Sequence, residues 1–285
     1  MILVIISAFS HALWNYLAKD SQDKESFMFL LNLYSTAIFF PIFYILIADI
    51  KLPTNIVPFL LASGIAETVY FIALGKAYET GDLSIVYPLA RSSPLFVTIF
   101  ASILIKETIT AWGIIGIFMV LIGVYVLHLK SLRVKDIRLT FRTLYDKASI
   151  NAIIAALGTT VYSISDKKGV TLTDPLLYSF WLGPVITAMM GAVVFHRKGF
   201  ESLRKAAHGN NIRIIASGFL MKGGYLLVLI ALSLAKVSYI LSIRQLSVVV
   251  GTILGLKLLK EEQPKIRMLG SLIIFLGVYI LGVLA

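Results

Sequence analysis

Long apolar runs of about 20 residues, separated by polar segments, constrain this chain more than any other feature of its sequence. A helix needs about 20 mainly apolar residues to cross about 30 Å of hydrocarbon. Only helices and closed barrels satisfy their backbone polar groups in that environment. The chain is 58% hydrophobic, with a mean hydropathy of +0.89, whereas soluble domains are about 45–50% apolar. We therefore predict an all-α integral membrane protein.

Ten runs are long and apolar enough to be transmembrane helices. Most connections between them are short and polar, but the segments 130–147 and 197–213 are longer and basic. The predicted spans are residues 2–19, 26–48, 56–79, 83–105, 109–129, 149–166, 175–196, 212–234, 237–259 and 266–284.

The net charge of +11 comes from cations in the connections, so it predicts topology rather than nucleic-acid binding. Assigning the connections to alternate sides places about 17 Lys and Arg residues on one side and about 5 on the other. Because cytoplasmic loops are basic, the first side is predicted to be cytoplasmic. Both termini then face the extracytoplasmic side.

The last part of the chain repeats a stretch from its middle. Thr98-Ile-Phe matches Thr252-Ile-Leu at an offset of 154 residues, and a Lys-Glu pair follows each copy. A second matched block then ends in Gly-Val-Tyr in both places, at Tyr125 and Tyr279. A repeat unit of five spans is odd, so the second copy enters the membrane inverted. Inverted repeats are typical of secondary transporters, whose substrate site lies between the halves.

These blocks divide the chain into three parts. Residues 1–129 form the first five-helix repeat, 130–148 a basic cytoplasmic loop, and 149–285 the second five-helix repeat.

Two segments carry a family resemblance. Pro88-Leu-Ala-Arg-Ser-Ser-Pro94 runs into Leu104-Ile-Lys-Glu107, and Ser242-Ile-Arg-Gln-Leu-Ser247 runs into Leu258-Leu-Lys-Glu261. With the glycine-spaced blocks that follow, the chain resembles ten-helix members of the drug/metabolite transporter superfamily, of the EamA type. The resemblance implies a transporter whose cavity is lined by helices 1, 3, 4, 6, 8 and 9. It does not identify the substrate.

Four ionisable residues lie deep inside predicted spans. Glu67 is about 16 Å into its helix, and Lys222 is at a similar depth in the equivalent helix of the second repeat. Arg91 and Arg244 are roughly 10–12 Å deep and are also near-equivalents. Four such groups facing lipid would cost roughly 10 kcal/mol, so we expect them to face a cavity or one another.

The charges admit two interpretations. Glu67 and Lys222 could form a structural ion pair that locks the halves together, with the arginines bonded to carbonyl groups. Alternatively, the excess of cations could bind the acidic group of a substrate, because arginine grips carboxylates and phosphonates through two hydrogen bonds. Glu67 would then meet a substrate amine or carry a coupling proton.

Further candidates surround these charges. His11 lies about 13 Å deep and is a candidate proton relay or substrate ligand. Asp166, beside Lys167 and Lys168, is interpreted as part of a solvated helix end, with a gate as the alternative. The aromatic candidates for a cavity wall that attracts ammonium groups are Trp14, Tyr70, Tyr87, Tyr162 and Tyr225.

No Walker A loop, H-E-x-x-H, G-x-S-x-G or Cys/His constellation occurs in the sequence. We therefore expect no metal, no cofactor and no enzymatic activity. The sequence favours a secondary active transporter in a bacterial inner membrane, moving a small amine- or acid-bearing metabolite by alternating access. Proton-coupled export is the first hypothesis, with a monomer and a homodimer both open. A flippase for a lipid-linked head group and a membrane accessory protein without turnover are the alternatives.

Overall fold

The computed structural model describes residues 1–18, 23–47, 51–80, 89–127, 129, 145–208, 211–250 and 264–285. Within these ranges the regular structure is entirely helical. Its helices are α1 (Ile2–Ala18), α2 (Lys24–Leu46), η1 (Thr54–Ile56), α3 (Val57–Thr80), α5 (Ser93–Leu104), α6 (Ala111–Leu127), α8 (Lys147–Leu172), α9 (Pro175–Ala207), α10 (Asn211–Leu234), α11 (Val237–Arg244) and α13 (Pro264–Val283).

In the described residues, six helical segments are long and apolar enough to cross a membrane. Shorter apolar helices cover residues 2–14, 93–104, 111–126 and 237–250. Side chains that point away from the bundle are largely apolar, as lipid contact requires. All of the following are 50% or more exposed: Phe9, Ile45, Ile65, Ile103, Phe118, Leu272 and Phe275.

Local signals in the sequence set several helix ends. Asp23 caps α2 by accepting a hydrogen bond from the Ser26 N–H, and Asp174 caps α9. Lys106 has a φ of 53°, and this left-handed residue follows the end of α5. Gly199, with a φ of 72°, interrupts α9 three residues after the predicted end of that span.

Four helices differ from prediction. The predicted span 83–105 is interrupted at Arg91 and Ser92 before α5 begins, and α11 is broken by a turn at residue 245. The other two continue further than predicted, α8 to Leu172 and α9 to Ala207.

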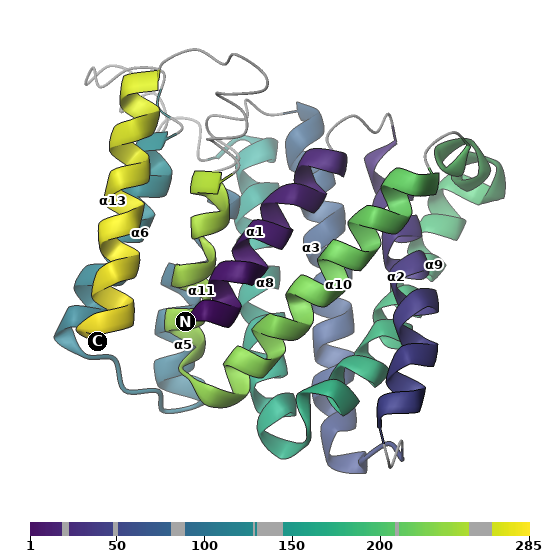
Figure 1. The fold of residues 1–285 in the computed structure, drawn as a ribbon. Coiled ribbons are helices and arrows are strands. Elements are labelled where there is room, and N and C mark those ends of the chain that lie inside the picture. Colours follow the sequence, from purple (N-terminus) through teal and green to yellow (C-terminus); the bar gives the residue numbers. More distant parts are fainter. Residues whose placement is uncertain are drawn as a thin grey trace.

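The helices form a bundle in which segments far apart in sequence lie side by side (Figure 1). The closest pairs are α3 with α8, α6 with α13, α1 with α10, and α2 with α9. Glycines permit the close approach. A Cβ at Gly277 would lie 2.8 Å from the carbonyl oxygen of Gly116, and one at Gly158 would lie 3.0 Å from that of Ala66. The second contact brings α3 and α8 together in the middle of the bundle, where polar side chains gather.

Candidate functional site

A cavity lies among α1, α2, α3, α8, α9, α10 and α11, with about 610 Å³ of empty space, part of it open to solvent. Its wall is mostly aromatic and apolar with a few convergent polar groups, which is the usual character of a small-molecule site. The lining residues are His11, Trp14, Asn32, Ser35, Thr36, Glu67, Tyr70, Phe71, Tyr162, Leu182, Gly183, Ile186, Met221, Lys222, Tyr225 and Arg244.

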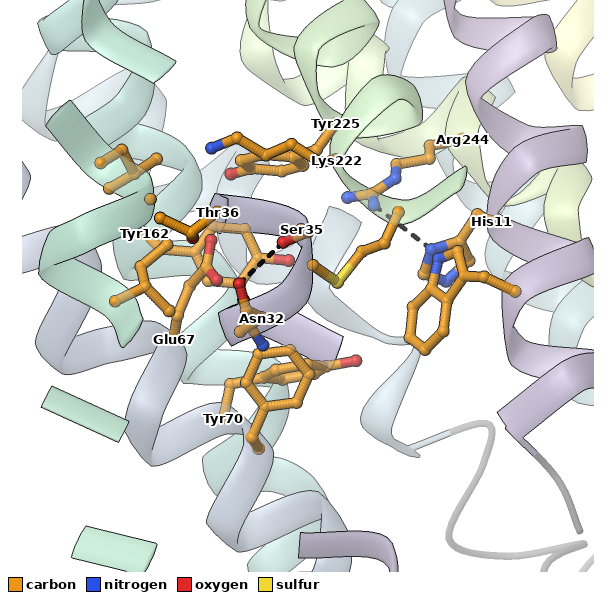
Figure 2. Close-up of a pocket in the computed structure, with 16 residues that line it drawn as sticks. His11, Asn32, Ser35, Thr36, Glu67, Tyr70, Tyr162, Lys222, Tyr225 and Arg244 are labelled. Carbon is orange, nitrogen blue, oxygen red and sulfur yellow. Dashed lines mark hydrogen bonds between the residues drawn. The ribbon is translucent and has the colours of Figure 1, made fainter. Parts of the chain in front are cut away.

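The charged side chains occupy two sides of this cavity. Figure 2 shows Glu67 and Lys222 on one side and Arg244 with His11 on the other. Glu67 is 8% exposed and Lys222 is 6% exposed. The Lys222 ammonium group donates a hydrogen bond to the carbonyl oxygen of Ser179 at 2.9 Å. Gly183 leaves room for it, since a Cβ there would lie 3.1 Å from Lys222 Nζ.

Asp166 is the acidic residue that sequence reasoning misplaced. It is fully buried, and its carboxylate accepts hydrogen bonds from the hydroxyls of Tyr178, at 2.8 Å, and Tyr225. The prediction of a solvated helix end was wrong because α8 continues six residues further. Lys167, not Asp166, points to a helix end, where it donates to the carbonyl oxygen of Ala235 at 2.9 Å.

The buried Asp166 changes the charge sum expected from the sequence. A second carboxyl group joins Glu67 opposite the three cations Lys222, Arg91 and Arg244. Tyr225, which donates to Asp166, lines the same cavity as Glu67. With every group ionised, the excess is one positive charge rather than two. Protonation of either carboxyl group would raise it to two.

His11 lies between the two arginines. Arg91 Nη2 is 2.9 Å from His11 Nε2, and Arg244 Nη2 is 3.4 Å from His11 Nδ1. The Trp14 ring packs edge-on against the imidazole, with 5.1 Å between ring centres. The guanidinium of Arg244 also lies 5.6 Å from the centre of the Tyr225 ring, a cation–π distance. His11 therefore joins α1 to the segments that carry both arginines.

Comparison with known proteins places this bundle in a family. A family model described as the EamA-like transporter family matches residues 1–129 and 146–283. The chain belongs to the EamA-like transporter family. The resemblance inferred from the sequence is confirmed, and the protein is a multi-pass membrane protein of a family of transporters rather than of enzymes.

The EamA-like fold also occurs in a solved crystal structure that is described only as that of a protein. It has a TM-score of 0.74 and 16% sequence identity, and the match covers 100% of this chain and 99% of the other. At this identity the likeness supports the fold alone. The comparison with curated proteins found no match.

The structure brings together most of the residues that the sequence singled out in this EamA-like chain. Arg91 reaches this group through its contact with His11. The other eight line the central cavity: His11, Trp14, Glu67, Tyr70, Tyr162, Lys222, Tyr225 and Arg244. Tyr87 lies outside the described residues. The aromatic residues form a continuous wall, with ring-centre distances of 6.1 Å for Tyr70–Tyr162 and 6.3 Å for Tyr162–Tyr225.

Sequence reasoning missed the polar contribution of α2. Asn32, Ser35 and Thr36 line the cavity, and Thr36 exchanges a hydrogen bond at 3.0 Å with Thr187 of α9. Neutral polar residues are common at packed membrane-helix interfaces, so their type alone gave no signal. Their spacing places them on one face of α2, and that periodicity could have indicated an inward-facing stripe.

Proposed function

We propose that this EamA-like protein is a secondary active transporter that exports a small amine- or acid-bearing metabolite by alternating access, in exchange for protons. The observation that carries the proposal is the pair of buried opposite charges, Glu67 and Lys222, beside one cavity in the middle of the bundle. Ionisable groups at this depth are expensive in a membrane protein and mark substrate or ion pathways.

The helix pairing supports two inverted five-helix repeats, residues 1–129 and 149–285, joined by a basic cytoplasmic loop at 130–148. Exchanging the two repeats replaces α1 by α8, α2 by α9 and α3 by α10, and the reverse. This exchange converts the contacting pair α1–α10 into α8–α3, and the pair α2–α10 into α9–α3. The α2–α9 and α6–α13 pairs are unchanged by the exchange. Thr36 and Thr187, 151 residues apart, bond to each other across one such pair. We infer ten spans on this basis, in a bacterial inner membrane with both termini outside.

Glu67 is the proposed coupling residue. Its carboxyl group faces the cavity, so a proton and a substrate ammonium group would compete for it. The aromatic wall formed by Tyr70, Tyr162 and Tyr225 surrounds that position and suits a bound ammonium group. When a proton and a substrate compete for one carboxylate, they cross the membrane in opposite directions. The substrate replaces the proton on one side, and a proton replaces the substrate on the other.

Proton movement in proteoliposomes tests this function. Vesicles holding a pH-sensitive dye would receive amino acids, primary amines and quaternary amines in turn. We expect at least one class to move protons with the wild-type protein, and Glu67→Gln to abolish that movement while folding is retained. Glu107→Gln is the matched control, since Glu107 accepts from Ser238 at the α5–α6 connection. Full proton movement in Glu67→Gln would contradict the coupling role, and no movement with any substrate would contradict proton exchange.

A further inference from the structure

A second cavity adjoins the central one, with about 680 Å³ of empty space, part of it open to solvent. The two cavities share a wall that contains His11, Trp14, Tyr162 and Arg244. Beyond that wall, the second cavity is lined by Arg91 as well as by neutral side chains. The described residues that line it include two guanidinium groups and no acidic side chain. Its charged lining is therefore entirely cationic, whereas the Glu67 side of the central cavity carries both signs, from Glu67 and Lys222.

The hydrogen-bond chemistry of His11 shows what this cavity lacks. Each ring nitrogen faces an arginine N–H, with Arg91 at 2.9 Å and Arg244 at 3.4 Å. A neutral imidazole has one acceptor nitrogen and one N–H donor, and a protonated one has two donors. At least one of the two contacts is therefore a donor facing a donor, whichever tautomer is present. The longer Arg244 contact is the natural candidate. An acceptor oxygen beside Arg244 would give its guanidinium group a better partner than the ring nitrogen at 3.4 Å.

A second observation comes from the break in α11. Arg244 is the last residue of α11, and Gln245 occupies the turn that follows. Among the described residues, neither Arg244 Nε nor Gln245 Oε1 has a hydrogen-bond partner, although both atoms are buried. Gln245 is 4% exposed and lines the second cavity. The NH₂ group of Gln245 donates to the carbonyl oxygen of Leu241 at 3.5 Å, so its free oxygen is an acceptor, and Arg244 Nε is the free donor that a ligand oxygen could meet. Buried polar atoms usually find partners, so their concentration here points to a polar ligand.

We propose that the second cavity is an oxyanion subsite, which binds the carboxylate or phosphate group of the substrate between Arg244, Arg91 and His11. This inference rests on the proposed transport function and specifies the acidic end of its substrate. Arg244 also lines the central cavity, so the other end of the same molecule would lie there, near Glu67, where an ammonium group fits. The substrate class is thus a compact zwitterion with its acidic end at Arg244 and its basic end near Glu67.

Trp14 provides a direct reporter, because it lines both cavities and packs on His11. The chain has three tryptophans, so Trp112→Phe with Trp181→Phe leaves Trp14 alone. Trp14 fluorescence and calorimetry would be recorded while propionate, inorganic phosphate or methylammonium is added to purified protein in detergent at constant ionic strength. We expect saturable binding of at least one of the two anions. Propionate alone would indicate a carboxylate subsite, and phosphate alone a phosphate subsite.

Variants at the subsite sharpen the test. We expect Arg244→Gln to weaken anion binding at least about tenfold, as loss of a charge-assisted hydrogen bond does. Gln245→Glu places a carboxylate beside the guanidinium groups and should abolish anion binding. Lys236→Gln is the matched control, since it removes one positive charge at the start of α11, where the ammonium group lies over the Tyr239 ring. Thermal unfolding of each variant identifies those that fold.

Two results would overturn the subsite. One is the absence of saturable binding of either anion by both methods. The other is wild-type anion affinity in both Arg244→Gln and Gln245→Glu, with each variant folded. The measurement needs no membrane gradient and no transport, so it reads the subsite separately from the proposed function. Anion binding without proton movement in vesicles would retain the subsite and remove the exchanger.

Discussion

The hydroxyl of Tyr225 donates a hydrogen bond to the carboxylate of Asp166, which joins α10 to α8 beside the central cavity. Asp166 has a second donor, the hydroxyl of Tyr178 on α9, which is fully buried. Tyr225 lines the cavity, whereas Tyr178 is not among its lining residues. The buried carboxyl group is therefore connected to the cavity through one of its two phenol partners.

This difference predicts separable effects for two matched variants. Tyr225→Phe and Tyr178→Phe each remove one hydrogen bond to a buried carboxylate, so each should lower the free energy of unfolding by about 1.5–3 kcal/mol. Only Tyr225→Phe should also change the pH profile of proton movement in vesicles, because it removes the hydroxyl that links Asp166 to the cavity lined by Glu67. Equal pH profiles for the two variants would show that Tyr225 is purely structural.

The contact between α6 and α13 predicts a strong position dependence for glycine substitution. A Cβ at Gly277 would lie 2.8 Å from the carbonyl oxygen of Gly116 and 2.9 Å from the backbone nitrogen of Val120. Backbone atoms cannot rotate away, so Gly277→Ala should lower the free energy of unfolding by about 1–3 kcal/mol. Gly75→Ala is the comparison, because a Cβ there meets only Glu25 Cγ, at 3.9 Å. Gly75→Ala should be neutral or stabilise the protein by up to about 1 kcal/mol. Thermal unfolding in detergent measures the stability of both variants.

The cap of α2 predicts a pH dependence of stability. Partial burial alone would raise the pKa of Asp23, but hydrogen bonds from Ser202 and Ser26 and the charge of Lys198 lower it overall. A lowered pKa in the folded state means that the carboxylate stabilises the protein above its unfolded pKa of about 3.9, and that this contribution is lost as the pH falls through the folded value.

Asp23→Ala should therefore lower the free energy of unfolding by about 1 kcal/mol at neutral pH, and the difference from wild type should shrink in acid. Asp23→Asn keeps an acceptor for the Ser26 N–H without the charge. It should therefore remove the pH dependence and avoid most of the loss of stability that Asp23→Ala causes. Unfolding midpoints between about pH 7 and about pH 3 check both variants. A constant difference between Asp23→Ala and wild type across that range would exclude titration of Asp23 as the cause.

Depth in the membrane could be counted from the sequence, and this is why Glu67 and Lys222 were singled out. A helix rises 1.5 Å per residue, so residue counting places a charge at the bilayer centre without knowledge of the fold. Periodicity also linked Tyr225 to Lys222, three residues apart on one helix. Both lie on the wall of the central cavity.

Contacts between helices could not be counted in this way. Asp166 was misread because the adjacent lysines suggested a helix end, and only the packing of α8 against α9 and α10 reveals its two tyrosine partners. The position of His11 between Arg91 and Arg244 depends on three separate segments of the chain. The break at Gln245 follows a run of apolar residues that reads as a continuous span. Each of these features depends on which helices are neighbours, and a repeat does not specify that.

The pairing of the helices also limits how the molecule can rearrange. Each of the closest pairs, α3–α8, α6–α13, α1–α10 and α2–α9, takes one helix from residues 1–129 and one from residues 146–283. Sliding one sequence half as a block past the other would disrupt all four pairs and the glycine contacts at Gly158 and Gly277. In the alternating-access cycle proposed here, the rigid bodies that rock against each other would therefore be hybrids, each built from helices of both halves.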